Sequence, residues 1–432
     1  MRTRTFAFLV ALSAACSDDT GGTGNGSAEI CTNQQDDDHD GFVDCADQDC
    51  WRSTACADAV TSGDAGDATT ASDATASDAS DATADTSGPD LPDLGDLPDV
   101  LASCDPCQDL GQVKGRVCAP SQQVYVNGAS VVVSGVGCNG EPFTKETTSG
   151  ADGSYWLLDV PCGTQTLSIT KGSFSAVYSI PVVGGEITDV SGAANKLCLQ
   201  ASKTKIAVLE GSYDNLQGLL AQLGFDYDLY TEHADPTAAG TIVGLLSDPT
   251  KLATYDILFA NCGAASGWMP QDHPEVMPNV KEFVVRGGSL YMSDYAWTYG
   301  EWSFPDAVEW YNDDDPSGMG DTDTSPQQIP SDTEVDATVV DGALANVLRK
   351  NKIHIVFDQG PQIAPQSVGA GTFAHVVGTI DVPFSFKLVD APLALSYVPA
   401  QGAGRVIYTN FHNDAQATGD MLTILNYLVF TL

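Results

Sequence analysis

Two segments carry the side chains best placed to do chemistry. Residues 287–297 read Gly-Gly-Ser-Leu-Tyr-Met-Ser-Asp-Tyr-Ala-Trp, and residues 408–414 read Tyr-Thr-Asn-Phe-His-Asn-Asp. In each segment the polar groups Asp294, His412 and Asp414 come at the end of an apolar run. A histidine beside a carboxylate can act as a general base, and carboxylates with a histidine can also hold a cation or a polar ligand. An ordinary network of buried ion pairs is the alternative.

The elements that position these groups follow from apolar spacing. Residues 280–286 read as a helix ended by Gly287, and residues 289–293 and 405–410 read as buried strands. Three earlier runs have strand character and one has helix character, namely 206–209, 226–230, 255–260 and 215–223. Strands that alternate with helices predict a parallel sheet covered on both faces, which is a flavodoxin-like α/β domain over residues 204–432.

Ligands of such sheets bind beyond the carboxyl ends of the strands. The side chains that this rule brings to one edge are Glu210, Asn261, Cys262, Asp294, Tyr295, His412 and Asp414. Cys262 is a candidate relocated nucleophile, although an unpaired cysteine at a strand end is more often a small buried apolar residue. Asn261 and Cys262 are candidate ligand-binding residues.

The helix, glycine stop, strand and turn at 280–294, followed by His412 and Asp414, resemble the class I glutamine amidotransferase-like fold and its ThuA-like members. The resemblance implies a Cys nucleophile in the turn and a His-x-Glu pair after the later strand. Here Asp294 takes the position of the cysteine, and His412 and Asp414 take those of the pair. The resemblance also implies that the loop at 261–263 supplies oxyanion-hole amides. A carboxylate lacks the nucleophilicity of a thiolate, so we do not expect glutaminase activity.

Aromatic residues gather in the expected loops of this domain. They are Trp268, Tyr295, Trp297, Tyr299, Trp302, Trp310 and Tyr311. Amphipathic rings suit a sugar face or a protein partner, and we take Tyr295 and Trp297 as candidate ligand contacts. Alternatively, the rings pack the segment 299–341 onto the sheet.

The N-terminus predicts export. Residues 1–15 combine two arginines with a short apolar run and read as a signal peptide. Leu12-Ser-Ala-Ala-Cys16 resembles a bacterial lipobox, which implies a lipid on Cys16 and, with Ser17 after it, delivery to the outer membrane. Residues 16–30 would then be a tether. Ordinary secretion is the alternative.

The remaining cysteines fall into two even clusters and one isolated residue. The clusters are Cys31, Cys45, Cys50 and Cys56, then Cys104, Cys107, Cys118, Cys138, Cys162 and Cys198. Even clusters in an exported chain predict disulfides, but spacing leaves their connectivity open. Zinc or redox use of Cys104-Asp-Pro-Cys107 is the alternative to structural bonding.

Charge excludes one class of partner. The net charge is −40, and a phosphate backbone demands clustered lysine and arginine, so we expect no nucleic acid. Residues 57–103 contain eleven Asp and no Lys or Arg, in Ala-Ser-Asp repeats followed by Pro-Asp-Leu repeats. Such a segment cannot bury a core, and we expect a disordered acidic linker that acts as a stalk.

Residues 31–56 contain a candidate calcium site. The expected oxygen ligands are the side chains of Asp36, Asp38, Asp40, Asp44 and Asp47 and the carbonyl of Phe42. Gly41 stands at the sixth position, where a calcium loop turns sharply. The spacing and the interleaved cysteines resemble a thrombospondin type 3 repeat. A further stretch of acidic tether is the alternative.

Residues 104–200 change to short β-branched runs separated by glycine and proline, which predicts a β-sandwich of about seven strands. The run at 148–163, Thr-Ser-Gly-Ala-Asp-Gly-Ser-Tyr-Trp-Leu-Leu-Asp-Val-Pro-Cys-Gly, resembles the carboxypeptidase regulatory-like domain, a carbohydrate-binding-like fold. The resemblance implies a spacer or a sugar-binding module.

The leading hypothesis is a lipid-anchored extracytoplasmic binding protein that holds calcium and binds a carbohydrate or protein ligand. The first alternative is a hydrolase in which His412 and Asp414 act with water activated by Asp294 or by a metal. The second alternative is a purely structural component of the envelope.

Overall fold

The computed structural model describes residues 104–192, 197–232, 235, 238–264, 273–311, 328–329, 333–357, 362–363, 365–381, 387–412 and 419–432. The predicted signal peptide, Cys16, the tether, the calcium motif and the acidic linker lie outside the described residues, as does Asp414. Within the described ranges, no helix is long and apolar enough to cross a bilayer.

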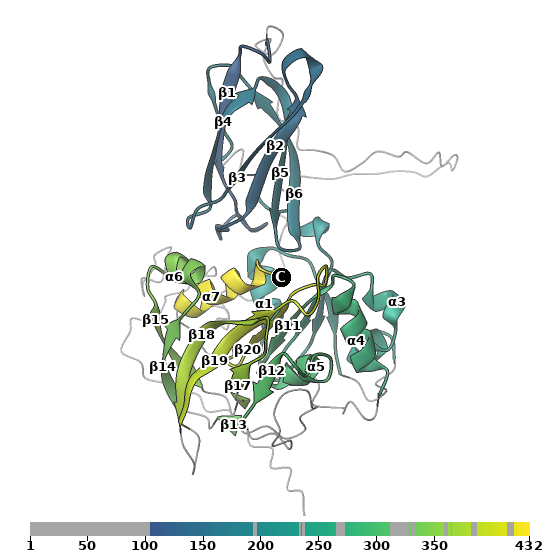
Figure 1. Cartoon of the computed structure of the whole chain (residues 1–432). Helices are drawn as coiled ribbons and strands as arrows, with labels where there is room; N and C mark the ends of the chain where they lie inside the picture. The colour runs from purple at the N-terminus through teal and green to yellow at the C-terminus, as the bar shows by residue number, and fades with distance from the viewer. Residues whose placement is uncertain are drawn as a thin grey trace, which may run out of the picture.

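The first folded part is a β-sandwich of seven strands, as expected (Figure 1). One sheet has the order β4-β1-β7 and the other has the order β3-β2-β5-β6. The bounds are β1 Leu110–Arg116, β2 Ser130–Val136, β3 Pro142–Thr148, β4 Ser154–Pro161, β5 Gly163–Lys171, β6 Phe174–Val182 and β7 Ile187–Asp189. Alternate residues of β2, such as Val131 and Val133, are buried between the sheets, because successive side chains of a strand point to opposite faces.

Three disulfides fix this sandwich. They join Cys104 to Cys162, Cys107 to Cys138, and Cys118 to Cys198. The prediction of structural disulfides in this cluster is therefore confirmed. Cys104 and Cys107 bond to different partners, which excludes a redox pair between them.

The second part contains a sheet of nine strands in the order β15-β14-β18-β19-β20-β11-β10-β8-β9. The bounds are β8 Ile206–Leu209, β9 Asp228–Tyr230, β10 Ile257–Ala260, β11 Ser289–Ser293, β14 Thr333–Val339, β15 Lys352–Phe357, β18 Thr372–Asp381, β19 Lys387–Tyr397 and β20 Val406–Thr409. Two small pairs lie outside it, β12 Val308–Trp310 with β17 Pro365–Val368, and β13 Gln328–Ile329 with β16 Gln362–Ile363.

Helices cover both faces of this sheet. The bounds are α1 Leu216–Leu223, α2 Ile242–Leu246, α3 Pro249–Leu252, α4 Val276–Val285, α5 Trp297–Glu301, α6 Gly342–Leu348 and α7 Gly419–Val429. Buried residues of α1, α6 and α7 belong to one core with Val208, Phe259 and Tyr291, whereas those of α2 and α4 belong to another with Leu209 and Met292. Successive residues of one strand therefore serve different cores, which explains the unbroken apolar runs.

The sheet is only partly parallel. Strands β9, β8, β10, β11 and β20 pair in parallel, whereas β19, β18, β14 and β15 continue from β20 in antiparallel pairs. These four antiparallel strands were not predicted from the sequence. Their side chains alternate between buried and exposed along much of β14 and β15, a pattern that differs from the fully buried runs of the parallel half.

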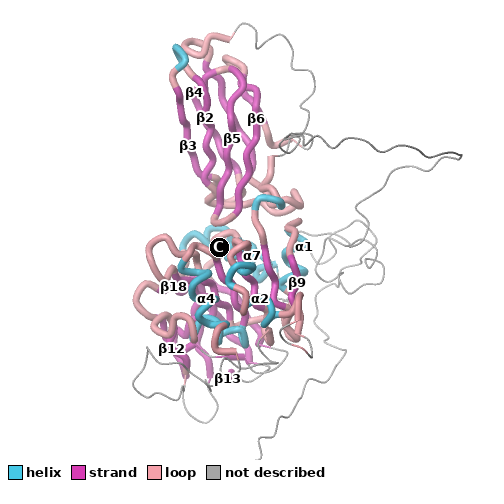
Figure 2. Tube along the Cα trace, turned by 90° about the vertical axis from the view of Figure 1, so that its right-hand side faces the viewer, coloured by secondary structure: helices cyan, strands magenta, loops and turns pink. Residues whose placement is uncertain are grey.

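The two parts meet at the C-terminus, which lies between the sandwich and the sheet (Figures 1 and 2). The amide of Ser173, in the β5–β6 turn, donates to the carbonyl of Leu432 over 2.6 Å. Rings of Phe174, Phe225 and Phe430 contact one another across the junction. The sandwich and one side of the sheet consequently share a continuous core.

Candidate functional site

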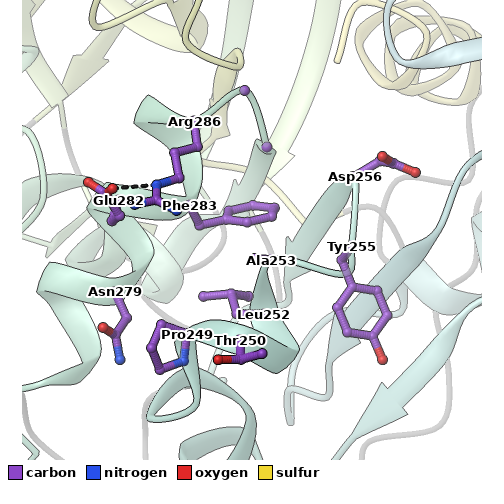
Figure 3. A pocket seen from close by; sticks show the side chains of 12 residues that line it. Pro249, Thr250, Leu252, Ala253, Tyr255, Asp256, Asn279, Glu282, Phe283 and Arg286 are labelled. Carbon is purple, nitrogen blue, oxygen red and sulfur yellow. Dashed lines mark hydrogen bonds and ion pairs between the residues drawn. The ribbon is translucent and has the colours of Figure 1, made fainter.

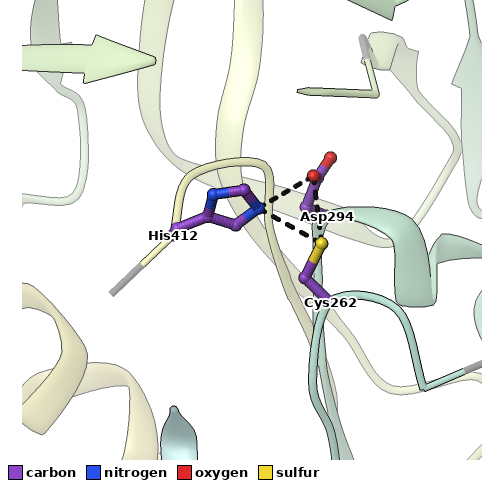
Figure 4. A group of neighbouring side chains, drawn as sticks. All are labelled: Cys262, Asp294 and His412. Carbon is purple, nitrogen blue, oxygen red and sulfur yellow. Dashed lines mark hydrogen bonds and ion pairs between the residues drawn. The ribbon is translucent and has the colours of Figure 1, made fainter. Parts of the chain in front are cut away.

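Three strand ends bring Cys262, Asp294 and His412 together. Cys262 follows β10, Asp294 follows β11, and His412 follows β20, so the three neighbouring parallel strands deliver them to one edge. His412 Nε2 lies 3.0 Å from Asp294 Oδ2 and 3.2 Å from Cys262 Sγ (Figure 4). Cys262 Sγ lies 3.3 Å from Asp294 Oδ2. The side chains are buried, with 0% of Cys262, 0% of Asp294 and 3% of His412 exposed.

Asp294 occupies a sharp turn. Its φ of +42° falls in the left-handed region, which a residue with a side chain adopts only under constraint. The turn leads from β11 into the 3-10 segment Asp294–Ala296. Both carboxylate oxygens have partners, because the backbone N–H of Ile363 donates to Oδ1 over 2.7 Å and the other oxygen faces His412 and Cys262.

The electrostatics of the cluster disfavour a thiolate. Burial raises the pKa of the Cys262 thiol well above its usual value, and the adjacent Asp294 carboxylate raises it further. Burial also raises the pKa of Asp294, against the lowering effect of His412. At neutral pH the thiol of Cys262 is therefore protonated, and a protonated thiol is a poor nucleophile.

The loop after β10 uses the amide that an oxyanion hole would need. The backbone N–H of Cys262 donates to Ser293 Oγ over 2.9 Å. Gly263, with a φ of +87°, completes the turn. The Cys262 amide therefore holds its own loop against β11, and in this arrangement it is not available to an oxyanion.

Asn261 is fully buried and bonded on both sides. Its Oδ1 accepts from Leu216 N over 2.9 Å, and its Nδ2 donates to the Leu209 carbonyl over 3.1 Å and to Gln217 Oε1 over 2.9 Å. These bonds tie the start of α1 to the end of β8. The side chain of Asn261, which was predicted to bind a ligand at the carboxyl edge of the sheet, therefore has a structural role here.

Most described aromatic residues of the predicted loops pack inward. Trp297, Tyr299 and Trp310 are buried, and the Trp310 ring lies edge-on to both Trp297 and Tyr408 at 5.3 and 5.0 Å between centroids. Tyr295 is half-buried and packs against the same core. Of the two interpretations, these contacts favour packing of the segment onto the sheet. Trp268 lies outside the described residues.

A separate hollow opens at the opposite end of the parallel strands. It has a volume of about 690 Å³ and includes Tyr255, Asp256, Phe283 and Arg286 among its lining residues (Figure 3). Asp256 precedes β10, so the hollow lies beyond the amino ends of the strands. The charged side chain of Arg286, which follows the last residue of α4, already forms an ion pair with Glu282 of that helix. This location is not where parallel sheets normally bind ligands.

Two groups that contribute to the site were not predicted from the sequence to do so. One is the backbone amide of Ile363, which is 69 residues from Asp294 along the chain. The other is the hydroxyl of Ser293, which holds the Cys262 amide. A backbone donor has no signature in the sequence, whereas Ser293 was visible as the residue before the turn.

Comparisons with solved structures give only weak likenesses. The TIE protein of Bacillus anthracis is 19% identical, with a TM-score of 0.17, over 21% of this chain and 16% of that one. Gan42B, a GH42 β-galactosidase from G. stearothermophilus, is 11% identical, with a TM-score of 0.27, over 48% and 27%. PurLQS from Thermotoga maritima is 11% identical, with a TM-score of 0.33, over 53% and 99%.

The chain thus spans less than a third of the first two of these proteins. No curated protein matches the sequence. The disulfides of residues 104–198 are compatible with an extracellular protein. Residues 112–193 match the carboxypeptidase regulatory-like domain, which suggests a binding or surface role.

Proposed function

We propose that the chain is an extracytoplasmic binding protein anchored to the outer membrane by a lipid on Cys16. A calcium-holding module at 31–56 and the acidic stalk at 57–103 would carry the two folded parts away from the membrane. The second part is then an amidotransferase-like, ThuA-like scaffold that has no thiol nucleophile in its turn. Its parallel strands and their order support this relationship, and the four antiparallel strands are an addition to it.

The observation that carries the proposal is Asp294 in the turn after β11. Its carboxylate is buried and occupied by Ile363, His412 and Cys262, so it is not free to attack a substrate. The thiol of Cys262, which contacts this carboxylate, has a pKa that burial raises well above its usual value. A site that holds its acid and its thiol in this way favours binding over amide hydrolysis.

We place the carbohydrate contact on the outer face of the sheet β4-β1-β7. Trp156 is 51% exposed there, and its indole N–H donates to Gln112 Oε1 over 3.0 Å. Leu158, on the same face of β4, is 56% exposed. An exposed indole held in place beside a side-chain amide offers an apolar face and a polar rim, which suits the two faces of a sugar ring.

A glycan array with the full chain tests this contact. We expect binding to a subset of glycans and a loss of about tenfold or more in affinity for Trp156→Ala, equivalent to about 1.4 kcal/mol. Val177→Ala is the matched control and should leave glycan binding unchanged, because it removes an exposed apolar side chain from β6, which belongs to the other sheet of the sandwich. Equal binding by the wild type and Trp156→Ala, or no binding to any glycan, would refute the carbohydrate proposal.

The anchor and the calcium module need separate tests. Palmitate labelling of cells should mark the wild type and not Cys16→Ala, and labelling of both would exclude a lipid on this residue. Calorimetry should give a calcium-binding heat for the full chain that Asp38→Asn with Asp40→Asn removes. The absence of any calcium heat at millimolar concentration would exclude the module as a calcium site.

A hydrolase is the second candidate, and one observation favours it. His412 Nε2 is 3.2 Å from Cys262 Sγ, which is hydrogen-bond reach for a base and a nucleophile. Activated esters and amides provide the test. Turnover by the wild type that is lost in Cys262→Ser would establish this alternative. We expect instead that the wild type and Cys262→Ser show the same turnover.

A further inference from the structure

We propose that Cys262, Asp294 and His412 form a binding site for one divalent cation of the zinc class. Their donor atoms Sγ, Oδ2 and Nε2 come from three different strand ends and face one another (Figure 4). The three separations are 3.0, 3.2 and 3.3 Å. This site is independent of the calcium module and of the carbohydrate contact proposed above.

The triangle of donor atoms is slightly smaller than a face of a zinc tetrahedron. With Zn–S near 2.3 Å and Zn–N and Zn–O near 2.0–2.2 Å, tetrahedral angles give S···N and S···O edges of about 3.6 Å and an N···O edge of about 3.4 Å. The distances on this triangle are each shorter by about 0.3–0.4 Å. An outward movement of a few tenths of an ångström admits the ion, and a water molecule would take the fourth position.

The donor types select the metal. A thiolate and an imidazole are ligands of zinc and similar transition metals, whereas calcium and magnesium take oxygen ligands. Charge indicates that the ion is divalent. A thiolate and a carboxylate together carry two negative charges, which a divalent cation neutralises, so the filled site would be electrically neutral in its buried setting. On binding, the thiol proton leaves to solvent and the imidazole lone pair on Nε2 takes the metal.

Neighbouring groups already orient two of the three donors. The amide of Ile363 holds Asp294 Oδ1 over 2.7 Å, which leaves Oδ2 directed at the centre of the cluster. Ser293 Oγ holds the amide of Cys262 over 2.9 Å, which fixes the start of the thiol's loop. Outer contacts of this kind preorganise a metal site, and losing one typically costs 10–100-fold in affinity.

The test uses the full chain, treated with chelator and then titrated with Co²⁺ alone. We expect one equivalent to produce a thiolate-to-cobalt charge-transfer band, together with the intense visible bands of tetrahedral cobalt. Zn²⁺ should displace the cobalt, and excess Ca²⁺ should not. Absence of the charge-transfer band in the wild type would overturn the proposal, and this measurement requires no variant to fold.

Variants then assign the ligands. Cys262→Ser should abolish the charge-transfer band, and Asp294→Asn and His412→Gln should each weaken Co²⁺ binding by about 100-fold or more, because removal of a ligand costs more than removal of an outer contact. Asp38→Asn, in the separate acidic module, is the matched control and should leave the band unchanged. A band that persists in Cys262→Ser would place the cobalt elsewhere and overturn the assignment.

Discussion

Removal of one ring at the junction should destabilise both folded parts. Phe174 begins β6 of the sandwich, whereas Phe225 follows α1 and Phe430 follows α7. Ring centroids lie 4.6 Å apart for Phe174 and Phe225 and 5.4 Å apart for Phe174 and Phe430. All three rings are buried in the same core. Replacing Phe174 therefore opens a cavity that both parts line.

The expected magnitude follows from that burial. Truncation of a buried phenylalanine to alanine costs about 3–5 kcal/mol, and this site is at the high end because rings surround it on two sides. The direct interaction between the rings of Phe174 and Phe430 contributes less than this. A double-mutant cycle with Phe174→Leu and Phe430→Leu should give a coupling energy of about 0.5–1.5 kcal/mol, as expected for rings in contact.

Urea unfolding of the full chain provides the assay. Fluorescence of Trp156 reports on the sandwich, and that of Trp297 and Trp310 reports on the sheet, so single-tryptophan variants separate the two. We expect Phe174→Ala to lower the midpoint of both reporters. Val177→Ala, in the same strand but 47% exposed, should change stability by less than about 0.5 kcal/mol. A shift confined to the sandwich reporter, or a coupling energy of zero, would refute a shared core.

Two further predictions concern acid stability and the β5–β6 turn. Burial raises the pKa of Asp341, but hydrogen bonds, led by that from His375, outweigh it and hold this pKa at about 2. Because this pKa is lower in the folded protein than the ordinary value of 3.8, the ionised carboxylate stabilises the fold at pH values above 3.8. About 2 kcal/mol of unfolding free energy should therefore be lost as the pH falls from about 4 to 2. Asp341→Asn should flatten the urea midpoint against pH in this window, and Asp336→Asn, at an exposed position, should not. At Gly172, with φ +54°, a Cβ would collide with the carbonyl oxygen of the C-terminal residue. Gly172→Ala should therefore lower stability by about 1 kcal/mol or more beyond Gly185→Ala, which has a positive φ but open space around it.

Each of these has a contradicting result. If the urea midpoint of Asp341→Asn depended on pH as that of the wild type does, the pair of Asp341 with His375 would not contribute to stability. Equal losses for the two glycine variants, measured by thermal unfolding, would show that the C-terminus is not packed against the turn in solution.

Local patterns predicted several elements around the site with close bounds, although α4 begins four residues before the predicted helix at 280–286. The strand at 289–293 and the strand at 206–209 were predicted with the bounds that β11 and β8 have. The predicted helix at 215–223 begins one residue before α1, because Asn215 is its N-cap and accepts from the amide of Gly218. These elements are buried on a face or on both faces, and burial leaves a clear apolar pattern.

Long-range pairing was not accessible in the same way. Strands β18 and β19 pair through a ladder with several register shifts, and irregular ladders break the alternation that reveals a strand. The contact of Cys262 with His412 joins residues 150 positions apart. The sequence placed both at one sheet edge, but their mutual distance depends on the order of β10, β11 and β20, which local patterns do not encode.

The central prediction is that Cys262, in the terminal domain, is not an activated nucleophile in the metal-free chain. The most direct measurement is the alkylation rate of Cys262 by iodoacetamide in the native, metal-free full chain, followed by mass spectrometry. A buried thiol that reacts only after local opening should be protected by about 1,000-fold relative to the unfolded chain, for an opening free energy of about 4 kcal/mol. Native Cys262 that is alkylated as fast as the unfolded chain, or faster, would contradict the account.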